Sequence, residues 1–269
     1  MKICHVINSL SGGGAETHLL NLVYAQKELG HTVNVIATGP DKKNMKSFDK
    51  EFTYASDDVL RLYFPRLLNL YSYVKFFKHL QKEQFDVVHT HQPRSDFMFF
   101  ILNFFTSFKP NWIVSIHGKY DTYLEGSLFF DYLRKLSMPL LVKIWNKSDH
   151  IICISEEVQK WLTFYKIKSR ISVINYWINN AKLENLEKTK ESINIGFMGR
   201  INKNKGIEDL LEVHKELNED RYSLFIAGSG KESYLKKLNE RYDLKNVNFL
   251  GYVSNKDKFF SNIDIFVFP

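Results

Sequence analysis

The stretch from Ile193 to Leu211 brings two cations, Arg200 and Lys205, close to two glycines, Gly199 and Gly206, with Lys203 between them. A short apolar run precedes them and an apolar repeat with helical period follows them, which predicts a buried strand, a loop and a helix. The free N–H groups and the positive dipole end of a helix start favour an anion. Arg200 can bind two oxygens at once, and Lys205 adds a point charge. Because Gly199 and Gly206 let the backbone approach a ligand closely, the loop is suited to a diphosphate.

A second glycine-rich turn, residues 11–16 (SGGGAE), follows the first predicted strand and precedes a predicted helix. Three glycines at a helix N-terminus suit the close approach of a phosphate or a sugar. The dinucleotide fingerprint G-x-G-x-x-G needs a third glycine, but Thr17 stands at that position. The stretch from Gly228 to Ser233 fails in the same way, so both argue against a nicotinamide-dependent enzyme. A plain turn here, and a solvated basic loop near residue 200, remain the alternatives.

Histidines occupy the ends of two predicted strands. His117 ends an apolar strand and precedes Gly118, so it lies at the sheet edge, where it can bind a hydroxyl or simply form a polar strand end. His89 and His91 lie two residues apart and share one face of an extended segment. No Cys, Asp or Glu cluster completes a ligand set with them, so we predict a structural role and no metal. We interpret Asp96 as a helix N-cap rather than a catalytic acid.

Apolar strand patterns alternate with helical patterns along the chain, which predicts a parallel, doubly wound α/β sheet. Strands are predicted at 3–7, 33–37, 87–89, 112–117, 151–154, 171–174, 193–198, 223–227, 247–250 and 263–268. The polar, lysine-rich stretch 175–192 is predicted as a linker between a domain at 1–174 and an incomplete domain at 193–269. The predicted fold is therefore α/β with two Rossmann-like domains that face a cleft, and ligands bind at the carboxyl ends of the strands.

Composition narrows the class of protein. A chain of 269 residues with 44% apolar residues can build two domains with real cores. Cys4 and Cys153 lie in apolar runs, which favours buried thiols in a reducing cytoplasm over a disulfide. The first apolar run is too short for a signal peptide, and the longest, 97–108, is shorter than the roughly 20 residues that span a bilayer. The net charge of +7 predicts affinity for acidic surfaces, but there is no nucleic-acid-binding motif, so nucleic acid is not expected as a partner.

The segment 66–83 predicts an amphipathic helix. One stripe carries Leu67, Leu70, Val74 and Phe77, and another carries Lys75, Lys78 and Lys82. A basic face next to aromatic residues suits an anionic membrane surface, which predicts a cytoplasmic protein able to bind the inner face of a membrane. A helix packed on the core with a solvated lysine face is the ordinary alternative.

Gly-Arg, followed five residues later by Lys-Gly and a helix, resembles the donor-binding signature of glycosyltransferase family 4, the retaining enzymes of the GT-B fold. The likeness extends along nearly all of the chain. It includes SGGGAETHLLNL, VVHTHQPRSD, IVSIHG, HIICISEEV, LFIAGSGKESYL, VNFLGYV and IDIFVFP, in this order. The order and spacing of these pieces together make the resemblance specific.

The resemblance implies transfer of a hexose from a nucleotide-diphosphate sugar to a glycan or lipid-linked acceptor, in surface polysaccharide or glycoconjugate synthesis. No Asp-x-Asp occurs, so no metal or other cofactor is expected, and phosphate charge is left to cations and helix dipoles. The acceptor side includes Glu16, and the catalytic residues are His117, Arg200 and Lys205. Donor-binding residues are Gly13, Gly14, Gly199, Arg200, Lys205, Gly206, Gly228 and Tyr252.

Two departures from the family pattern affect these expectations. Where many members have Asn-Gly-hydrophobic-Asp, this chain has NYWIN at 175–179, and Tyr176 in place of Gly alters the turn. The family places two donor-binding glutamates beyond the position of Pro269. We therefore expect a truncated second domain, little or no turnover by this chain alone, and poor solubility from an uncovered strand at 263–268. The alternative function is a non-catalytic truncated product, or a subunit of a split transferase that needs a second polypeptide.

Overall fold

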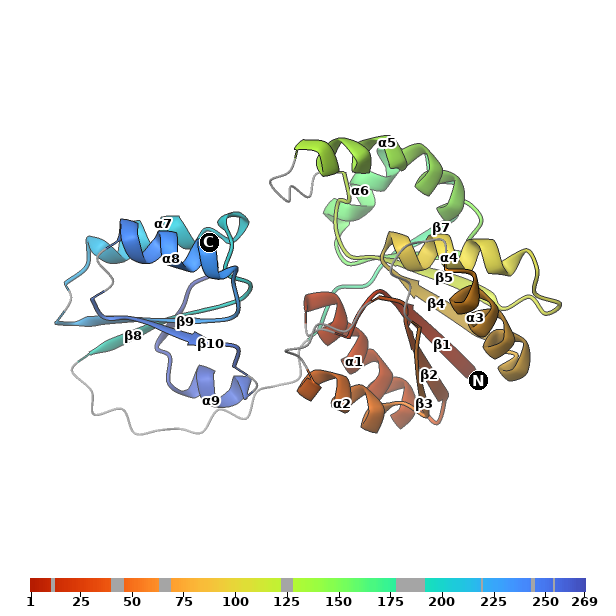
Figure 1. The fold of residues 1–269 in the computed structure, drawn as a ribbon, viewed down its shortest axis with the longest axis horizontal. Helices are drawn as coiled ribbons and strands as arrows, with labels where there is room; N and C mark the ends of the chain where they lie inside the picture. Colours follow the sequence, from red (N-terminus) through yellow and green to blue (C-terminus); the bar gives the residue numbers. More distant parts are fainter. Residues whose placement is uncertain are drawn as a thin grey trace. The chain divides into compact units, whose positions relative to one another are not determined.

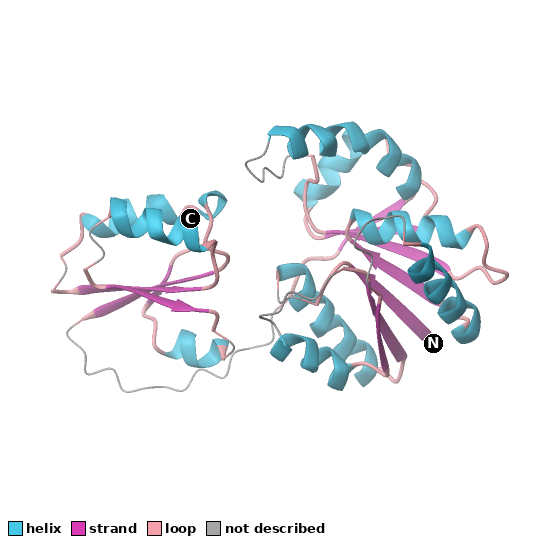
Figure 2. Cartoon of the chain, in the orientation of Figure 1, coloured by secondary structure: helices cyan, strands magenta, loops and turns pink. Residues whose placement is uncertain are grey.

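The chain divides into two compact units, Met1–Ile178 and Asn179–Pro269, each built from a parallel sheet and helices (Figures 1 and 2). The structure is a computed structural model that describes residues 1–10, 13–39, 46–62, 69–121, 128–177, 192–218, 220–242, 245–253 and 255–269, without the side chains of 46–49 and 128–130. The boundary between the units lies inside the stretch predicted as a linker, of which 178–191 lies outside the described residues. Residues 175–177 belong to the first unit.

The first unit contains a seven-stranded parallel sheet with the order β3-β2-β1-β4-β5-β6-β7. Its strands are β1 (Lys2–Ile7), β2 (Thr32–Ala37), β3 (Asp58–Arg61), β4 (Val87–His91), β5 (Asn111–Ile116), β6 (His150–Cys153) and β7 (Arg170–Val173). Its helices are α1 (Gly14–Glu28), α2 (Lys46–Ala55), α3 (Leu70–Glu83), α4 (Pro93–Asn103), α5 (Leu128–Trp145) and α6 (Glu156–Phe164). The direction of winding reverses between β1 and β4, which marks the carboxyl ends of these strands as the expected ligand-binding edge.

Helices cover both faces of this sheet (Figure 2). Side chains of α1 and α2, such as Leu19 and Phe52, form one buried cluster, and side chains of α3 to α6, such as Phe76 and Trp145, belong to another. The predicted α/β class is confirmed, and Cys4 and Cys153 are buried free thiols. Strand β3 and helix α2 were not predicted, because β3 is a short, half-buried edge strand with charged ends.

Helix α3 packs a different stripe from the predicted one. Leu67 lies outside the described residues, and Leu70 and Val74 are 75% and 44% exposed. Phe76 and Leu80 are fully buried instead. Leu70 and Val74 therefore do not pack on the core as the core-helix alternative required, although Phe77 is partly buried against it, and they lie exposed on the same helix as the lysines. None of the described helices is long and apolar enough to cross a bilayer.

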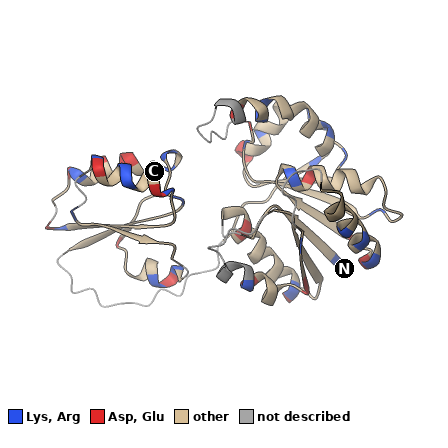
Figure 3. Cartoon of the chain, in the orientation of Figure 1, with Lys and Arg blue, Asp and Glu red and all other residues tan. Residues whose placement is uncertain are grey.

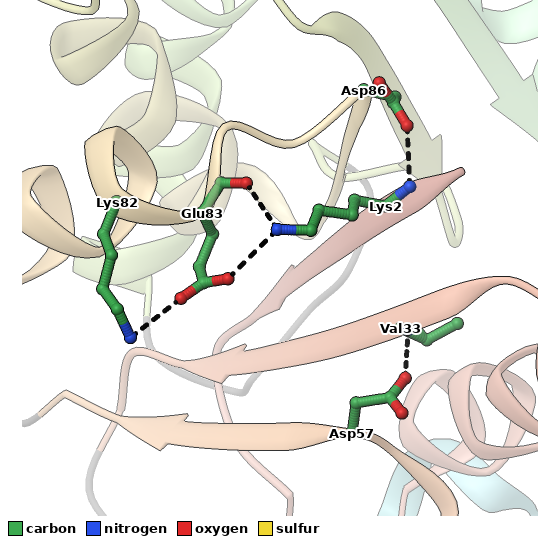
Figure 4. Close-up of polar contacts among 6 residues, drawn as sticks. All are labelled: Lys2, Val33, Asp57, Lys82, Glu83 and Asp86. Carbon is green, nitrogen blue, oxygen red and sulfur yellow. Dashed lines mark hydrogen bonds and ion pairs between the residues drawn. The ribbon is translucent and has the colours of Figure 1, made fainter.

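Four aspartates hold the amino ends of parallel strands in register. Each of them directly precedes or opens a strand and accepts a hydrogen bond from an N–H near the start of the neighbouring strand. The pairs are Asp57 with Val33 at 2.6 Å, Asp86 with Lys2 at 2.7 Å, Asp149 with Trp112 at 2.7 Å and Asp264 with Asn194 at 2.8 Å. Figure 4 shows the first two, and Lys2 also binds Glu83 there through its ammonium group. Fixing the register at the amino ends of the strands also fixes how far their carboxyl ends extend relative to one another.

Replacing one of these carboxylates tests this register role. Asp149→Ala leaves the N–H of Trp112 without its acceptor, so we expect the free energy of unfolding to fall by about 1–2 kcal/mol. Asp149→Asn keeps an acceptor oxygen and should cost less. Urea denaturation followed by tryptophan fluorescence measures both, because all four tryptophans lie in the first unit. Equal losses for the two variants would contradict the proposed hydrogen bond.

The second unit contains a four-stranded parallel sheet with the order β10-β9-β8-β11. Its elements are β8 (Ile193–Met198), η1 (Lys203–Lys205), α7 (Ile207–Lys215), β9 (Tyr222–Ala227), α8 (Glu232–Arg241), β10 (Val247–Gly251), α9 (Lys256–Ser261) and β11 (Ile265–Phe266). Helices α7 and α8 lie on one face and α9 on the other (Figure 1). The strand predicted at 263–268 is shorter than expected, and Ile265, Phe266 and Phe268 are 47%, 45% and 55% exposed.

Candidate functional site

The loop after β8 carries most of the predicted site residues of the second unit. Gly199 follows the strand, Arg200 is exposed, and Lys205 ends the single-turn helix η1. Gly206 has φ of +62° and is the N-cap of α7, so glycine permits the left-handed conformation from which the helix starts. The Nζ atom of Lys205 lies 4.7 Å from the ring centroid of Phe268. The structure thus joins two cations and a helix N-terminus in one loop, as predicted.

Two other predicted residues lie at the same edge of this sheet. The N–H of Gly228 donates to the carbonyl of Gly251, the residue before Tyr252, at 2.7 Å. Gly228 has φ of +143°, and a Cβ atom there would lie 1.7 Å from the carbonyl oxygen of Gly199. The loops after β8, β9 and β10 are therefore in contact through their backbones. This packing leaves room for glycine alone at position 228.

The contact predicts a large penalty for a single methyl group. Gly228→Ala is expected to lower the free energy of unfolding of the second unit by about 3 kcal/mol or more, because it adds strain and a backbone clash. Gly251→Ala is the matched control, since its φ is +65° but, among the described residues beyond its chain neighbours, no atom lies within 4 Å of its Cβ position. It should cost about 1 kcal/mol. Circular dichroism during urea unfolding measures both, and a similar cost for the two would contradict the predicted clash.

In the first unit, the side chain of Glu16 folds back over the glycine-rich turn. Gly13 is the N-cap of α1, and Gly14 is the first residue of the helix. Glu16 is 6% exposed, and its carboxylate accepts a hydrogen bond from the hydroxyl of Ser9 at 3.0 Å. One Glu16 oxygen lies 2.5 Å from the Cβ position of Gly13, so the side chain folds back over the turn. The expectation that Glu16 lies near a glycan or lipid-linked acceptor substrate remains a prediction.

His117 lies directly after β5, at the edge where the sequence placed it, within a cluster of aromatic rings. Its Nδ1 atom is hydrogen-bonded to the hydroxyl of Tyr176. The ring of Tyr176 stacks on His18 at 4.2 Å and 15°, and Trp177 packs edge-on against His18 at 5.2 Å. The centroids of His18 and His117 lie 6.1 Å apart. Tyr176, the residue that departs from the resembled pattern, therefore belongs to this aromatic cluster.

Three further imidazoles lie beneath His117 on the same sheet face. Strand pairing places His5 opposite His89, and His91 opposite Ser115. One ring nitrogen from each of His5, His89 and His91 lies within 4.8 Å of the others. The sequence identified the pair on β4 but not His5, because His5 reaches them only through the pairing of β1 with β4.

Burial keeps these imidazoles neutral. It lowers the pKa of His5 to about 4, of His18 to about 4 and of His117 to about 3. The pKa values of His89 and His91 are lowered well below the usual range, first by burial and then by the neighbouring histidines. At neutral pH each ring therefore carries one proton and offers one donor and one acceptor nitrogen.

Asp96 is not the helix N-cap that was predicted. Gln92 occupies that position of α4, and Asp96 lies within its first turn at 1% exposure. Its carboxylate accepts a hydrogen bond from Nε1 of Trp145 at 2.9 Å. Burial raises the pKa of Asp96 to about 7. Its contacts tie α4 to α5, so we assign it a packing role.

The sequence model of Glycosyltransferase Family 4 matches residues 12–182, more than half of the chain. The chain belongs to Glycosyltransferase Family 4. The model of Glycosyl transferases group 1 matches residues 179–269, so the two matches divide close to the boundary between the structural units. The resemblance stated from the loop residues is thereby confirmed for both halves.

Relatives and solved structures of this family 4 chain agree with that assignment. The O-antigen biosynthesis glycosyltransferase WclY of Escherichia coli is 24% identical over 287 residues, which cover all of this chain and 73% of WclY. The capsular polysaccharide biosynthesis glycosyltransferase CapM of Staphylococcus aureus is 25% identical over 259 residues, which cover 88% of this chain and 66% of CapM. This chain thus spans about two thirds to three quarters of the length of these relatives.

The crystal structure of HepE from Anabaena in complex with UDP-glucose superposes on this chain with a TM-score of 0.76 at 17% identity. The match covers 99% of this chain and 73% of HepE. At that identity the likeness concerns the fold, and it confirms the GT-B fold class predicted from the sequence.

Proposed function

We propose that the protein is a retaining glycosyltransferase that moves a hexose from a nucleotide-diphosphate sugar to a glycan or lipid-linked acceptor. The observation that carries the proposal is the loop after β8, which joins Arg200, Lys205 and the N-terminus of α7 in a family 4 chain. Such a loop can neutralise the charge that develops on a departing diphosphate without a metal ion. His117 would contact the donor hexose, as the family resemblance implies.

The relatives suggest the pathway and the first donor to test. WclY and CapM are named for O-antigen and capsular polysaccharide synthesis, which supports an acceptor that belongs to a surface polysaccharide. HepE was solved with UDP-glucose, which supports a UDP-sugar as the donor.

Isothermal titration calorimetry with UDP and UDP-glucose, in the presence of EDTA, tests the donor site. We expect saturable binding of UDP that does not need a divalent ion, and tighter binding of a UDP-sugar that is the true donor. Absence of binding by UDP and by a panel of nucleotide diphosphates would overturn the proposal. Turnover measured with the same 269-residue chain tests the separate expectation that it has little activity by itself.

Peripheral binding to an anionic membrane is the second part of the proposal. Helix α5 exposes Tyr132, Leu136 and Leu140, which lie at helical spacing beside Lys135 and Lys143. Helix α3 likewise exposes apolar residues beside lysines, and basic positions are distributed along both helices (Figure 3). Apolar side chains can enter the interface while lysines bind acidic headgroups.

A vesicle assay tests this surface. We expect the protein to co-sediment with vesicles that contain phosphatidylglycerol and not with pure phosphatidylcholine. Leu136→Glu should weaken vesicle binding at least tenfold, because it removes about 2 kcal/mol of apolar burial and adds a repelled charge. Val213→Glu is the matched control, since Val213 is an exposed apolar residue on α7 of the second unit. Equal binding of the two variants would exclude α5 from the membrane contact.

A further inference from the structure

Five side chains of the first unit form a continuous chain of hydrogen bonds, which we call the imidazole relay. It starts at Oε1 of Gln26 on α1, which lies 2.7 Å from Nε2 of His5. Nδ1 of His5 lies 3.1 Å from Nε2 of His91, and Nδ1 of His91 lies 3.1 Å from Nε2 of His117. Nδ1 of His117 is bonded to the hydroxyl of Tyr176. Each imidazole therefore uses both of its nitrogens within the relay.

Strand pairing explains how residues so far apart in the sequence meet. Paired residues of adjacent parallel strands lie on the same sheet face, and residues two apart along one strand share that face. His5 pairs with His89, and His91 is two residues beyond it on β4. His91 pairs with Ser115, and His117 is two residues beyond that one. The three relay histidines thus form a diagonal row across β1, β4 and the end of β5.

The amide oxygen at the start of the relay sets the direction of every hydrogen bond in it. An amide oxygen can only accept, so Nε2 of His5 carries the proton and its Nδ1 is an acceptor. Nε2 of His91 must then donate to His5, and Nε2 of His117 must donate to His91. Since the rings are neutral, Nδ1 of His117 carries no proton. The hydroxyl of Tyr176 therefore donates to it.

We propose that Gln26, His5 and His91 are positioning residues that hold His117 in its Nε2–H tautomer. Nδ1 of His117, the nitrogen at the outer end of the relay, is then an obligate acceptor. It selects a ligand group that donates, such as a sugar hydroxyl, and rejects groups that only accept, such as a phosphate oxygen. The assignment of that hydroxyl to the donor hexose rests on the proposed function, whereas the tautomer does not. In this structure the hydroxyl of Tyr176 donates to Nδ1 of His117, in the place that the ligand hydroxyl would take.

A metal ion held by His5, His89 and His91 is the competing interpretation of the same cluster. Such an ion would need an unprotonated nitrogen on each of the three rings, whereas Nδ1 of His5 and Nε2 of His91 share a proton in their hydrogen bond. It would also compete with the hydrogen bond between His89 and the hydroxyl of Ser115 at 2.7 Å. The relay satisfies its nitrogens without an ion. Titration with Co²⁺ tests the alternative, and a visible absorption band from a tetrahedral imidazole site would overturn the relay.

The tautomer can be observed directly. We would label histidine with ¹⁵N and record long-range proton–nitrogen spectra in mildly alkaline buffer, with the His117 signals assigned by their loss in His117→Asn. In the wild type we expect the Nε2–H form for His5, His91 and His117. Gln26→Met removes the terminal acceptor, so we expect the tautomer of His117 to become mixed. Gln26→Glu keeps an acceptor and should restore the wild-type spectrum.

Gln26 suits this test because it is only half-buried and lies at the end of the relay opposite to His117. An Nδ1–H form of His117 in the wild type would overturn the proposal. A His117 signal that is identical in the wild type and Gln26→Met would also overturn it, because the ring would then be held by local contacts alone.

Binding measurements separate this inference from the proposed function. Gln26→Met should weaken the binding of UDP-glucose about fivefold and leave the binding of UDP unchanged, since only the former has a hexose. Gln26→Glu should bind both like the wild type. A changed tautomer with unchanged binding of UDP-glucose would overturn the role in selecting a hydroxyl. If the wild type binds no nucleotide sugar at all, the proposed function fails while the spectra still decide the relay.

Discussion

Arg200→Ala is expected to weaken the binding of UDP by about 10–100-fold, because a guanidinium that binds diphosphate oxygens supplies roughly 1.5–3 kcal/mol. A change in affinity on removal of Arg200 can be assigned to the ligand, because this side chain has no other polar contact to lose among the described residues. Arg200 is exposed and makes no hydrogen bond or ion pair with the part of the chain that the structure describes. Its removal should leave the folded protein unchanged, so the loss in affinity reports on the ligand. Calorimetry with UDP measures it.

Two further variants distinguish a specific contact from the general positive charge of the loop. Lys205→Ala should weaken UDP binding by a similar amount, although it also removes the contact of Lys205 with the ring of Phe268. Lys203→Ala removes an equal charge from the same single-turn helix, where Lys203 is exposed. We expect it to change the affinity less than threefold, as for a screened surface charge. A loss equal to that of Arg200→Ala would show that the loop acts only through its total charge.

The loop after β8 was predictable because its parts are neighbours in the sequence. Gly199, Arg200, Lys205 and Gly206 fall between one apolar run and one helical repeat, so local pattern alone places them on a strand–loop–helix junction. The same holds for the parallel sheets, whose strands are apolar runs of the expected length. Short edge strands such as β3, with a charged residue at each end, carry no such signal.

The imidazole relay was not predictable, because its bonds join residues that are distant in the sequence. His5 and His91 are 86 residues apart, and His117 and Tyr176 are 59 apart. Only the strand order β1-β4-β5 brings them together, and alternation within one strand cannot reveal that order. The spacing of His89 and His91 showed that they share a sheet face. Nothing in the sequence showed that His5 and His117 lie beside them.

The buried face of α3 was not predictable for a different reason. Apolar residues cover a broad arc of this helix, with Phe76 and Leu80 towards one side of it and Leu70 and Val74 towards the other, so more than one stripe fits a 3.6-residue period. Periodicity selects a face only when the other faces are polar. The packing of α3 against its neighbours decided in favour of Phe76 and Leu80. Leu70 and Val74 therefore face outward, and we propose that they contact a membrane.

The free energy of unfolding of the first unit should fall steeply as the pH is lowered from 6.5 towards 4. A histidine whose pKa is lowered in the folded state stays largely neutral there, but in the unfolded state it becomes protonated as the pH falls below about 6.5, so acid stabilises the unfolded chain. Each such group contributes up to about 1.4 kcal/mol per pH unit. His5, His89 and His91 are all fully or almost fully buried and act in this direction.

Asp96 acts in the opposite direction and supplies a control for the same experiment. Because burial raises its pKa to about 7, the folded state takes up a proton there that the unfolded state does not, and acid stabilises the folded state in the same window. The three most deeply buried histidines against one carboxyl give a net slope of at least about 2–3 kcal/mol per pH unit, and His18 and His117 add to it in the same direction. Asp96→Asn removes the opposing group, so its slope should be steeper by about 1.4 kcal/mol per unit, whatever its stability at neutral pH.

Urea denaturation at a series of pH values, followed by tryptophan fluorescence, reports on this unit alone because it contains all four tryptophans. A stability that is flat between pH 6.5 and 5 would mean that the buried imidazoles are protonated in the folded state. A charged imidazole donates through both nitrogens and cannot accept. The relay needs an acceptor at each ring, so a flat profile would contradict both the neutral cluster and the tautomer assigned to His117. A steep profile is required by both, which makes this simple measurement an early test of the first unit's site.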